Sequence, residues 1–359
     1  MSLSDFVQEV TGESHLRVEQ DLGDGFVRLE ISEAERRQAI QDIRSSEDVV
    51  LELLRNSRDA HARNIYLAVN RSDKTRILTI IDDGDGIPQN MHELVFEPRV
   101  TSKLETSHID KWGYHGRGMA LYSIACNAES AAILKSKPEL GTALSVRTNL
   151  EKLSEKKDQS SFPVFHMVED GSVAVRGPKN IIRTACEFAI EVRNECNVFV
   201  GSATEIAATL YESACSTKCI ADSLIANDIE SLPITKRLIT AKTPDDFAHL
   251  ATSLGLEMGD RSARRIMDGE ITALNPLLDL IKIDQAESAA DLREKPKSMK
   301  AVSKPLSLSI EDRNSFSEDV AKSFERLADK YYLNSEITPR VRILGNSLQI
   351  SIPLIKDER

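Results

Sequence analysis

The pattern of apolar and polar positions changes its period near residue 64. Before that point, Ser32 and Glu35 form a capping-box pattern, which predicts a helix over residues 33–44. The stretch "SSED" can cap a second helix that continues to residue 62. From "NIYLAVN" to "RILTIID", apolar and polar residues alternate around "RSDK", which predicts a β-hairpin.

The next seventy residues continue the mixture of strands and helices. A long polar loop is expected from residue 88 to residue 113, followed by a helix over "GMALYSIACNA". "AAILKSK" and "TALSVRT" predict two further strands. This order predicts an α+β fold, in which a mixed sheet is covered by helices on one face.

The remaining two-thirds of the chain predict further domains. Polar residues 151–161 and basic, proline-punctuated residues 291–305 are expected to be linkers. We therefore expect an N-terminal domain over 1–150, an α+β to helical region over 160–290, and a C-terminal helix and hairpin over 305–359. Within the middle region, "IIRTACEFAIEV" fits either a strand or a helix, and a helix follows "NVFVG".

Composition and charge exclude some classes of protein. The 359 residues are 41% hydrophobic and 29% charged, which is typical of a globular protein. A net charge of −11 argues against a whole surface that binds polyanions, and 5% aromatic residues argue against stacking platforms for single-stranded nucleic acid. Five scattered cysteines fit reduced thiols. Without a signal peptide or an apolar run long enough to span a membrane, we expect a cytoplasmic protein.

A polar stripe on the second predicted helix is the first candidate for chemistry. Glu52, Asn56 and Asp59 recur at helical spacing, whereas Leu53 and Leu54 are suited to a core. A carboxylate can activate water, and an amide oxygen is a suitable ligand for Mg²⁺. A solvated helix face is the alternative reading of the stripe alone.

Two glycine-containing motifs follow the predicted hairpin. In "DDGDGIP", Asp82 ends a strand, and Gly84 and Gly86 permit tight turns and close approach of a ligand; a simple turn is the alternative. In "GYHGRGMALYSI", three glycines precede a helix, where backbone amides form an anion site. These three are Gly113, Gly116 and Gly118. The motif is neither a P-loop nor a dinucleotide-binding fingerprint.

Taken together and in this order, the motifs resemble a known superfamily. "ELLRNSRDA", "DDGDGI", "TSK" and "GYHGRGMAL" resemble the N-box, first glycine box, lid lysine and second glycine box of the GHKL ATPases, whose fold is the Bergerat sandwich. "GTALSV" resembles the last box of that superfamily. The lid and second glycine box are most similar to those of MutL and type IIB topoisomerases. Arg55 departs from these relatives, which often carry an acid before the asparagine.

The resemblance implies a role for each matching residue. It implies ATP and Mg²⁺ as cofactors, Glu52 as the general base for water, and Asn56 as the metal ligand. Asp82 would bind the adenine amino group, with Thr142 reaching the adenine through water. The remaining residues that the resemblance assigns to the nucleotide site are Asp59, Gly84, Gly86, Lys103, Gly113, Gly116 and Gly118.

The resemblance also implies an activity and partners. We expect an ATPase that hydrolyses Mg-ATP and uses closure of the lid, residues 88–115, to switch homodimerisation or contacts with a protein partner. A role in DNA transactions is open, because residues 246–271 resemble a helix-turn-helix motif; a helical hairpin packed in the core is the alternative. Two other functions remain: a signalling kinase acting on a separate partner, and a scaffold gated by ATP without hydrolysis.

Overall fold

A computed structural model gives the fold of the chain. It describes residues 18–102, 108–110, 113–115, 118–167, 173–216, 229–284, 316, 319–322, 324, 340–344 and 347–352. The chain divides into two compact units, Met1–Ala286 and Glu287–Arg359, and each is described by itself.

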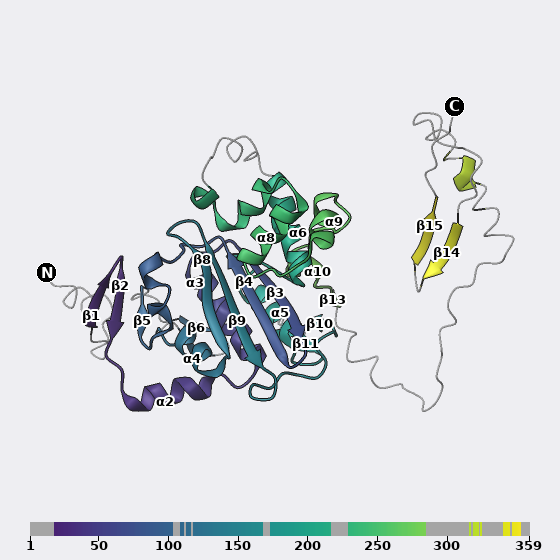
Figure 1. Cartoon of the computed structure of the whole chain (residues 1–359). Coiled ribbons are helices and arrows are strands. Elements are labelled where there is room, and N and C mark those ends of the chain that lie inside the picture. The colour runs from purple at the N-terminus through teal and green to yellow at the C-terminus, as the bar shows by residue number, and fades with distance from the viewer. Residues whose placement is uncertain are drawn as a thin grey trace, which may run out of the picture. The chain divides into compact units, whose positions relative to one another are not determined.

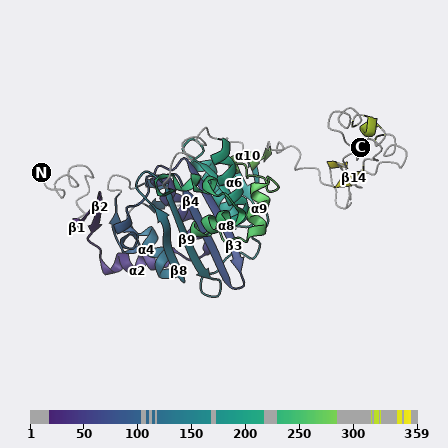
Figure 2. The ribbon, with the colours of Figure 1, turned by 45° about the horizontal axis from the view of Figure 1, so that its top comes forward.

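A five-stranded sheet forms the centre of the first unit. Its strands lie in the order β12, β3, β4, β9 and β8, and Figures 1 and 2 show β3, β4, β9 and β8 beside one another. Their bounds are β3 (Asn64–Ser72), β4 (Thr75–Asp82), β8 (Ser130–Ser136), β9 (Thr142–Asn149) and β12 (Asn197–Gly201). β12 is parallel to β3 and the other neighbours are antiparallel, so the predicted mixed sheet and α+β class are confirmed.

One face of this sheet packs against α3 (Ser46–Asp59), α4 (Ala120–Asn127) and α5 (Ile181–Glu191). Ile65 and Leu67 of β3 share this core with Leu53 and Leu54 of α3, and all four are at most 1% exposed. The segment that fitted either a strand or a helix therefore forms a helix, α5, and its N-cap Asn180 accepts a hydrogen bond from the backbone of Arg183.

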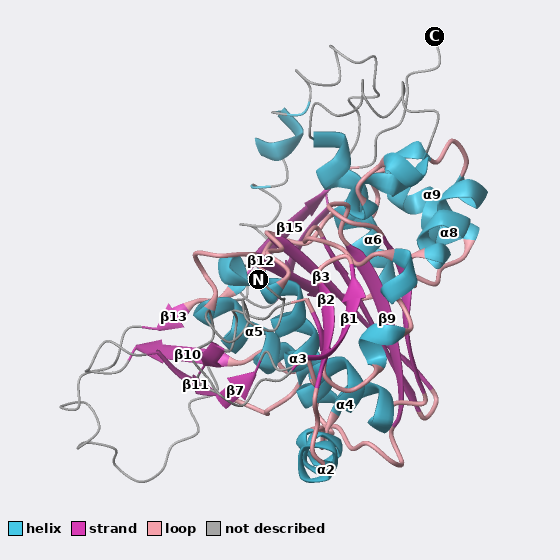
Figure 3. Ribbon diagram, turned by 90° about the vertical axis from the view of Figure 1, so that its left-hand side faces the viewer, coloured by secondary structure: helices cyan, strands magenta, loops and turns pink. Residues whose placement is uncertain are grey.

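The opposite face of the sheet is covered as well. It packs against α6 (Ala203–Ser216), α8 (Pro244–Ser253) and α9 (Asp260–Met267), which Figure 3 shows across the sheet from α3 and α5. Tyr66 of β3 stacks on Phe199 of β12, with ring centroids 4.8 Å apart. The helices of the N-terminal sandwich, α3 and α4, thus lie on one face as expected, and the helices of residues 203–267 add a second layer on the other face. The reason is visible in β4, where Ile77, Leu78, Ile80 and Ile81 supply apolar side chains to both faces.

Elements after residue 160 extend and cover the same sheet. Strand β12 pairs in parallel with β3, Asn197 opposite Asn64 through Gly201 opposite Ala68. The expected division between residues 150 and 160 consequently does not separate compact units, because residues on both sides of it belong to the first unit. The second predicted linker, 291–305, lies outside the described residues.

The segment suspected of being a helix-turn-helix motif contributes to the core. α8 and α9 pack against each other and bury Phe247, Ala251, Ala263 and Ile266 in the core beneath the sheet. This arrangement is the helical hairpin that the sequence left open. Arg261, Arg264 and Arg265 are exposed on α9.

Smaller elements complete the first unit. A three-stranded sheet contains β1 (Val18–Gly23), β2 (Phe26–Leu29) and β5 (Val100–Thr101), and a second contains β10 (Val164–Met167), β11 (Val173–Arg176) and β13 (Ile283–Asp284). Helix α2 (Glu33–Asp42) begins at Ser32 with both hydrogen bonds of the predicted capping box. The other elements are β6 (His108–Asp110), β7 (Gly113–His115), α10 (Leu277–Leu280) and 3₁₀ helices at Gln89–Met91, Leu94–Phe96, Ile229–Ser231 and Ile234–Thr240.

The second unit contains the predicted hairpin. Strands β14 (Arg340–Leu344) and β15 (Ser347–Ser351) pair antiparallel, with Leu344 opposite Ser347. The predicted turn residues, Gly345 and Asn346, lie outside the described residues. Among the residues that are described in either unit, no helix has the length and apolar character needed to cross a membrane.

Candidate functional site

One cavity of about 620 Å³ brings most of the predicted site residues together. It lies between α3, the end of β4, β5, the start of α4 and the start of β9. The predicted residues that line it are Glu52, Asn56, Asp59, Asp82, Gly86, Gly118 and Thr142. A cavity of this size falls within the range of roughly 300–1,000 Å³ that is usual for small-molecule sites.

The other predicted residues do not line the cavity within the described part of the chain. Gly84 lies beside it in the turn after β4, and its backbone amide donates a hydrogen bond to Asp82. Gly113 begins the short strand β7. Lys103 and Gly116 lie outside the described residues.

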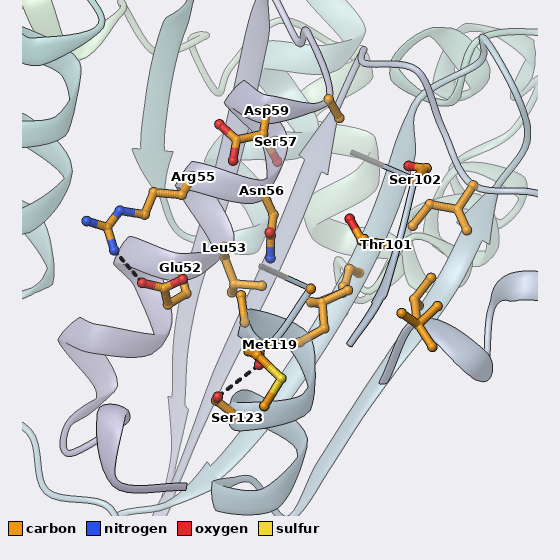
Figure 4. Close-up of a pocket in the computed structure, with 18 of the residues that line it drawn as sticks. Glu52, Leu53, Arg55, Asn56, Ser57, Asp59, Thr101, Ser102, Met119 and Ser123 are labelled. Atoms are coloured by element: carbon orange, nitrogen blue, oxygen red, sulfur yellow. Dashed lines mark hydrogen bonds and ion pairs between the residues drawn. The ribbon is translucent and has the colours of Figure 1, made fainter. Parts of the chain in front are cut away.

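Helix α3 supplies the polar stripe because its two sides meet different surroundings. Ser45 caps the helix by accepting a hydrogen bond from the backbone of Asp48, and the leucine side packs on the sheet. This packing leaves the polar side facing the cavity. Figure 4 shows Asn56 extending from α3 toward the space between this helix and Thr101.

Glu52, the predicted general base, is held in an ion pair. Arg55, one helical turn along α3, donates a hydrogen bond to the Glu52 carboxylate over 2.5 Å (Figure 4). The side chains are 6% and 20% exposed for Arg55 and Glu52, respectively, so solvent screens the pair only weakly. A carboxylate that accepts a charge-assisted hydrogen bond is a poorer acceptor for a proton from water.

Asp59 is also paired within its own helix. Both Nε and Nη2 of Arg58 donate to Asp59 Oδ1, over 2.9 and 2.7 Å. The Asp59 side chain is 5% exposed. Its carboxylate therefore lines the cavity in an orientation that the neighbouring guanidinium fixes.

Asp82 lies at the sheet end of the cavity. It is the last residue of β4, it is 4% exposed, and the β4–β9 register sets it directly opposite Thr142. Ser57 of α3 donates a hydrogen bond to Asp82 Oδ2 over 2.8 Å, and the backbone amide of Gly84 donates to Oδ1 over 3.0 Å. These two donors orient a buried carboxylate so that it can accept a further hydrogen bond from a ligand.

Thr142 belongs to a second hydrogen-bonded group at this end. Its hydroxyl is 3.0 Å from Ser136 Oγ, which also contacts the carbonyl of Gly141 at 3.0 Å. The backbone amide of Ile87 donates to the same Ser136 oxygen over 2.7 Å. Ser136 thus joins β8, β9 and the turn after β4 around the cavity.

Gly86 permits a backbone contact that no other residue would allow. Its φ is +72°, and a Cβ added there would lie 1.9 Å from the carbonyl oxygen of Lys137. The left-handed conformation favours glycine, and the close contact requires it. The contact brings the turn after β4 against the loop that leads into β9, and this closes one wall of the cavity.

Among the described residues around the cavity, the charges are mostly negative. Its carboxylates are Glu35, Asp42, Asp48, Glu52, Asp59, Asp82 and Asp85. Among its described lining residues, the cationic side chains are Arg55 and Arg99. Such a set suits a ligand that arrives with a divalent cation, and Asn56 offers the side-chain oxygen that Mg²⁺ prefers. Within the described residues, no group of three or more His, Cys, Asp or Glu side chains is arranged to hold a metal ion.

Three contributors to the site are absent from the residues predicted to form it. Ser57 lies inside the "RNSRDA" motif, so its position beside Asn56 was the available sequence signal. Ser136 and Arg99 carried no such signal. Ser136 reaches Thr142 only because β8 pairs with β9, and Arg99 reaches the cavity through the β2–β5 pairing.

Comparison with known families finds a match for the part of the chain that builds most of the cavity. The family described as "Histidine kinase-, DNA gyrase B-, and HSP90-like ATPase" matches residues 43–168, which include α3, β3, β4, α4, β8 and β9. Residues 43–168 are therefore similar to the ATPase domains of this family, which is the GHKL superfamily.

Within that superfamily, the domain is similar to the DNA mismatch repair protein MutL. The MutL of Parabacteroides distasonis is 38% identical over 110 residues, which are 29% of this chain and 18% of that protein. The MutL of Bacteroides fragilis is 42% identical over 101 residues, 27% of this chain and 16% of that protein. The MutL of Clostridium beijerinckii is 42% identical over 80 residues, 21% of this chain and 12% of that protein. The matching segment thus spans less than a fifth of each of these relatives.

Proposed function

We propose that this chain binds Mg-ATP in the cavity beside α3 and hydrolyses it. The observation that carries the proposal is the meeting, around one cavity, of the acid and amide stripe of α3 with the buried Asp82–Thr142 pair. Asp82 would accept a hydrogen bond from the adenine amino group, and Asn56 would ligate Mg²⁺. Bound Mg²⁺ would neutralise charge on the phosphates and act as a Lewis acid.

Glu52 would act as the general base for the attacking water. Its carboxylate lies one helical turn from Asn56, so the base and the metal ligand face the same cavity. The Arg55 guanidinium donates to Glu52 Oε1 over 2.5 Å, which stabilises the ionised carboxylate and makes it a weaker base for the proton of water. We expect slow turnover for this reason.

Nucleotide binding would in turn switch an assembly. We propose that ATP draws the lid, residues 88–115, over the cavity and that closure changes homodimerisation or contacts with a protein partner. The similarity to MutL supports a role in DNA transactions. Among the described residues, the exposed arginines of α9 are the first that we would replace in a DNA-binding assay.

The Glu52–Arg55 ion pair favours one alternative, a scaffold that binds ATP without hydrolysing it. The two proposals are separated by ATP turnover and ATP binding measured on the wild type, Glu52→Gln and Arg55→Met. If the protein is an ATPase, the wild type releases phosphate, and Glu52→Gln binds ATP but does not. If it is a scaffold, the wild type binds ATP but releases no phosphate, as Glu52→Gln does.

Arg55→Met adds a test of the ion pair itself. If the pair restrains the base, the variant hydrolyses ATP faster than the wild type while binding it with similar affinity. If Arg55 instead helps to hold the phosphates, the variant binds ATP more weakly. Failure of the wild type to bind ATP at all refutes the proposed function in both forms.

A further inference from the structure

Arg99 is a buried cation at the edge of the cavity. It directly precedes β5, and its backbone has a left-handed φ of +61°. Its amide donates to the carbonyl of Gly118 over 2.9 Å, and its carbonyl accepts from Leu29 over 3.0 Å. These bonds fix the Arg99 backbone beside the glycine that precedes α4.

The Arg99 guanidinium has only part of its hydrogen-bonding capacity in use. Its side chain is 6% exposed, and Nη2 forms an ion pair with Glu35 Oε1. Nε and Nη1 are buried and have no hydrogen-bond partner within the described chain. Burying a hydrogen-bond donor without a partner costs free energy of folding, and the cost is larger when the donor is charged. A ligand that accepts hydrogen bonds from these donors would recover that free energy on binding.

The charges around the cavity indicate which chemical group of a ligand accepts from Arg99. Among the described residues that line the cavity, seven carry carboxylates and two are arginines, of which Arg55 is engaged with Glu52. Nε and Nη1 are cationic N–H donors, and the oxygens of a phosphate group are strong acceptors of such charge-assisted hydrogen bonds. A ligand with a carboxylate could accept from the same donors. Its negative charge would be repelled by the carboxylates of the cavity, and it would not bring a metal ion to offset that repulsion.

We propose that Arg99 binds a phosphate group of the nucleotide, with Glu35 as the positioning residue that holds its guanidinium toward the cavity. This inference rests on the proposed function and assigns it a further binding residue. The location of Arg99 agrees with a phosphate contact. Arg99 is hydrogen-bonded to Gly118 at the α4 end of the cavity, whereas Asp82 and Thr142, the proposed adenine contacts, form the sheet end.

Glu35 is itself fixed from the opposite side. Its Oε2 accepts hydrogen bonds from both the backbone amide and the hydroxyl of Ser32, each over 2.9 Å. The hydrogen bond from the Ser32 backbone is the largest cause that lowers the pKa of Glu35, and the charge of Arg99 adds to it. The carboxylate therefore stays ionised at neutral pH and keeps its hold on Nη2.

The test compares ligands that differ only in their phosphates. Binding of adenosine, ADP and ATP in the presence of Mg²⁺ is measured by calorimetry on the wild type, Arg99→Met and Arg28→Met. Arg28 is the matched control, because it lies in β2, forms an ion pair with Glu97 and does not line the cavity. We expect Arg99→Met to weaken ADP and ATP about 10- to 100-fold and to leave adenosine within about twofold. Arg28→Met should leave all three affinities unchanged.

The outcomes separate this inference from the proposed function. If Arg99→Met binds ATP as tightly as the wild type, or loses adenosine by the same factor, Arg99 has no phosphate contact and the inference is overturned. If the wild type binds none of the three ligands, the proposed function fails first and takes this inference with it.

A measurement on the wild type covers the case in which Arg99→Met does not fold. In the NMR spectrum of protein labelled with ¹⁵N-arginine, the Nε–H resonance of Arg99 is assigned as the one that is absent from the spectrum of Arg99→Lys. We expect this resonance to shift with ADP and ATP but not with adenosine. A resonance that stays in place with all three ligands, while calorimetry shows that they bind, would overturn the inference.

Discussion

The close backbone contact at Gly86 gives the sharpest test of how the cavity is built. Replacing Gly86 with alanine places a Cβ 1.9 Å from the carbonyl oxygen of Lys137, whereas ordinary van der Waals contact begins at 3.4 Å. The obstructing atom is backbone, so it cannot move away by changing a rotamer. Gly269 is a matched control, because its φ is also +72° and a Cβ there would have no heavy atom within 4 Å.

The two variants share one cost and differ in another. An L-residue in the left-handed region costs roughly 1–2 kcal/mol, which applies to Gly86→Ala and to Gly269→Ala. Only Gly86→Ala adds a clash, and overpacking of this kind costs about 1–3 kcal/mol more. We therefore expect Gly269→Ala to lose about 1–2 kcal/mol and Gly86→Ala about 2–5 kcal/mol of unfolding free energy.

The same difference should appear more strongly in ligand binding. To relieve the clash, the turn after β4 has to move away from the loop before β9 by about 1.5 Å, from 1.9 Å to 3.4 Å, which also displaces the hydrogen-bonded groups around Asp82. Gly86→Ala should lower ATP affinity at least about tenfold, whereas Gly269→Ala should leave it unchanged.

The assay combines urea unfolding, followed by circular dichroism at 222 nm, with calorimetry of ATP binding to each folded variant. Equal losses of stability in the two variants would show that the clash is relieved at no cost. Unchanged ATP affinity in Gly86→Ala would show that this contact does not shape the binding site. Either result would refute the reasoning.

Three further predictions concern hydrogen bonding, pH and thiol reactivity. Ser57→Ala removes a donor to the buried Asp82 carboxylate, so it should cost about 1–3 kcal/mol in urea unfolding; a cost below about 0.5 kcal/mol would contradict this. Because the pKa of Glu35 is lowered from 4.5, its ionised form stabilises the fold above that pH, and this contribution is lost as pH falls through the lowered pKa. The stability advantage of the wild type over Glu35→Gln should therefore shrink in titrations below pH 4.5, and a constant difference would argue against the linkage. Iodoacetamide should label exposed Cys126 in the native protein, as read by mass spectrometry; burial raises the pKa of Cys186 to about 12, so labelling of Cys186 at an equal rate would be inconsistent with the fold.

The sequence by itself determined the local structure and the class of site. The capping box of Ser32 and Glu35 and the two apolar strands joined by the turn near Asp73 depend on contacts between near neighbours. The stripe of Glu52, Asn56 and Asp59 depends only on the period of one helix. Local rules describe such features well, because the residues involved are held close together by the chain itself.

Only the tertiary structure decided which distant residues meet. Asp82 and Thr142 form one end of the cavity because β4 pairs with β9 in a single register, and a slip of one residue would turn Thr142 to the other face. The addition of β12 to the sheet beside β3, more than a hundred residues earlier, and the covering of the second face by α6, α8 and α9 likewise depend on packing between distant segments. The meeting of Arg99 with Glu35 has the same origin, since no local pattern relates an arginine before a two-residue strand to a glutamate in an earlier helix cap.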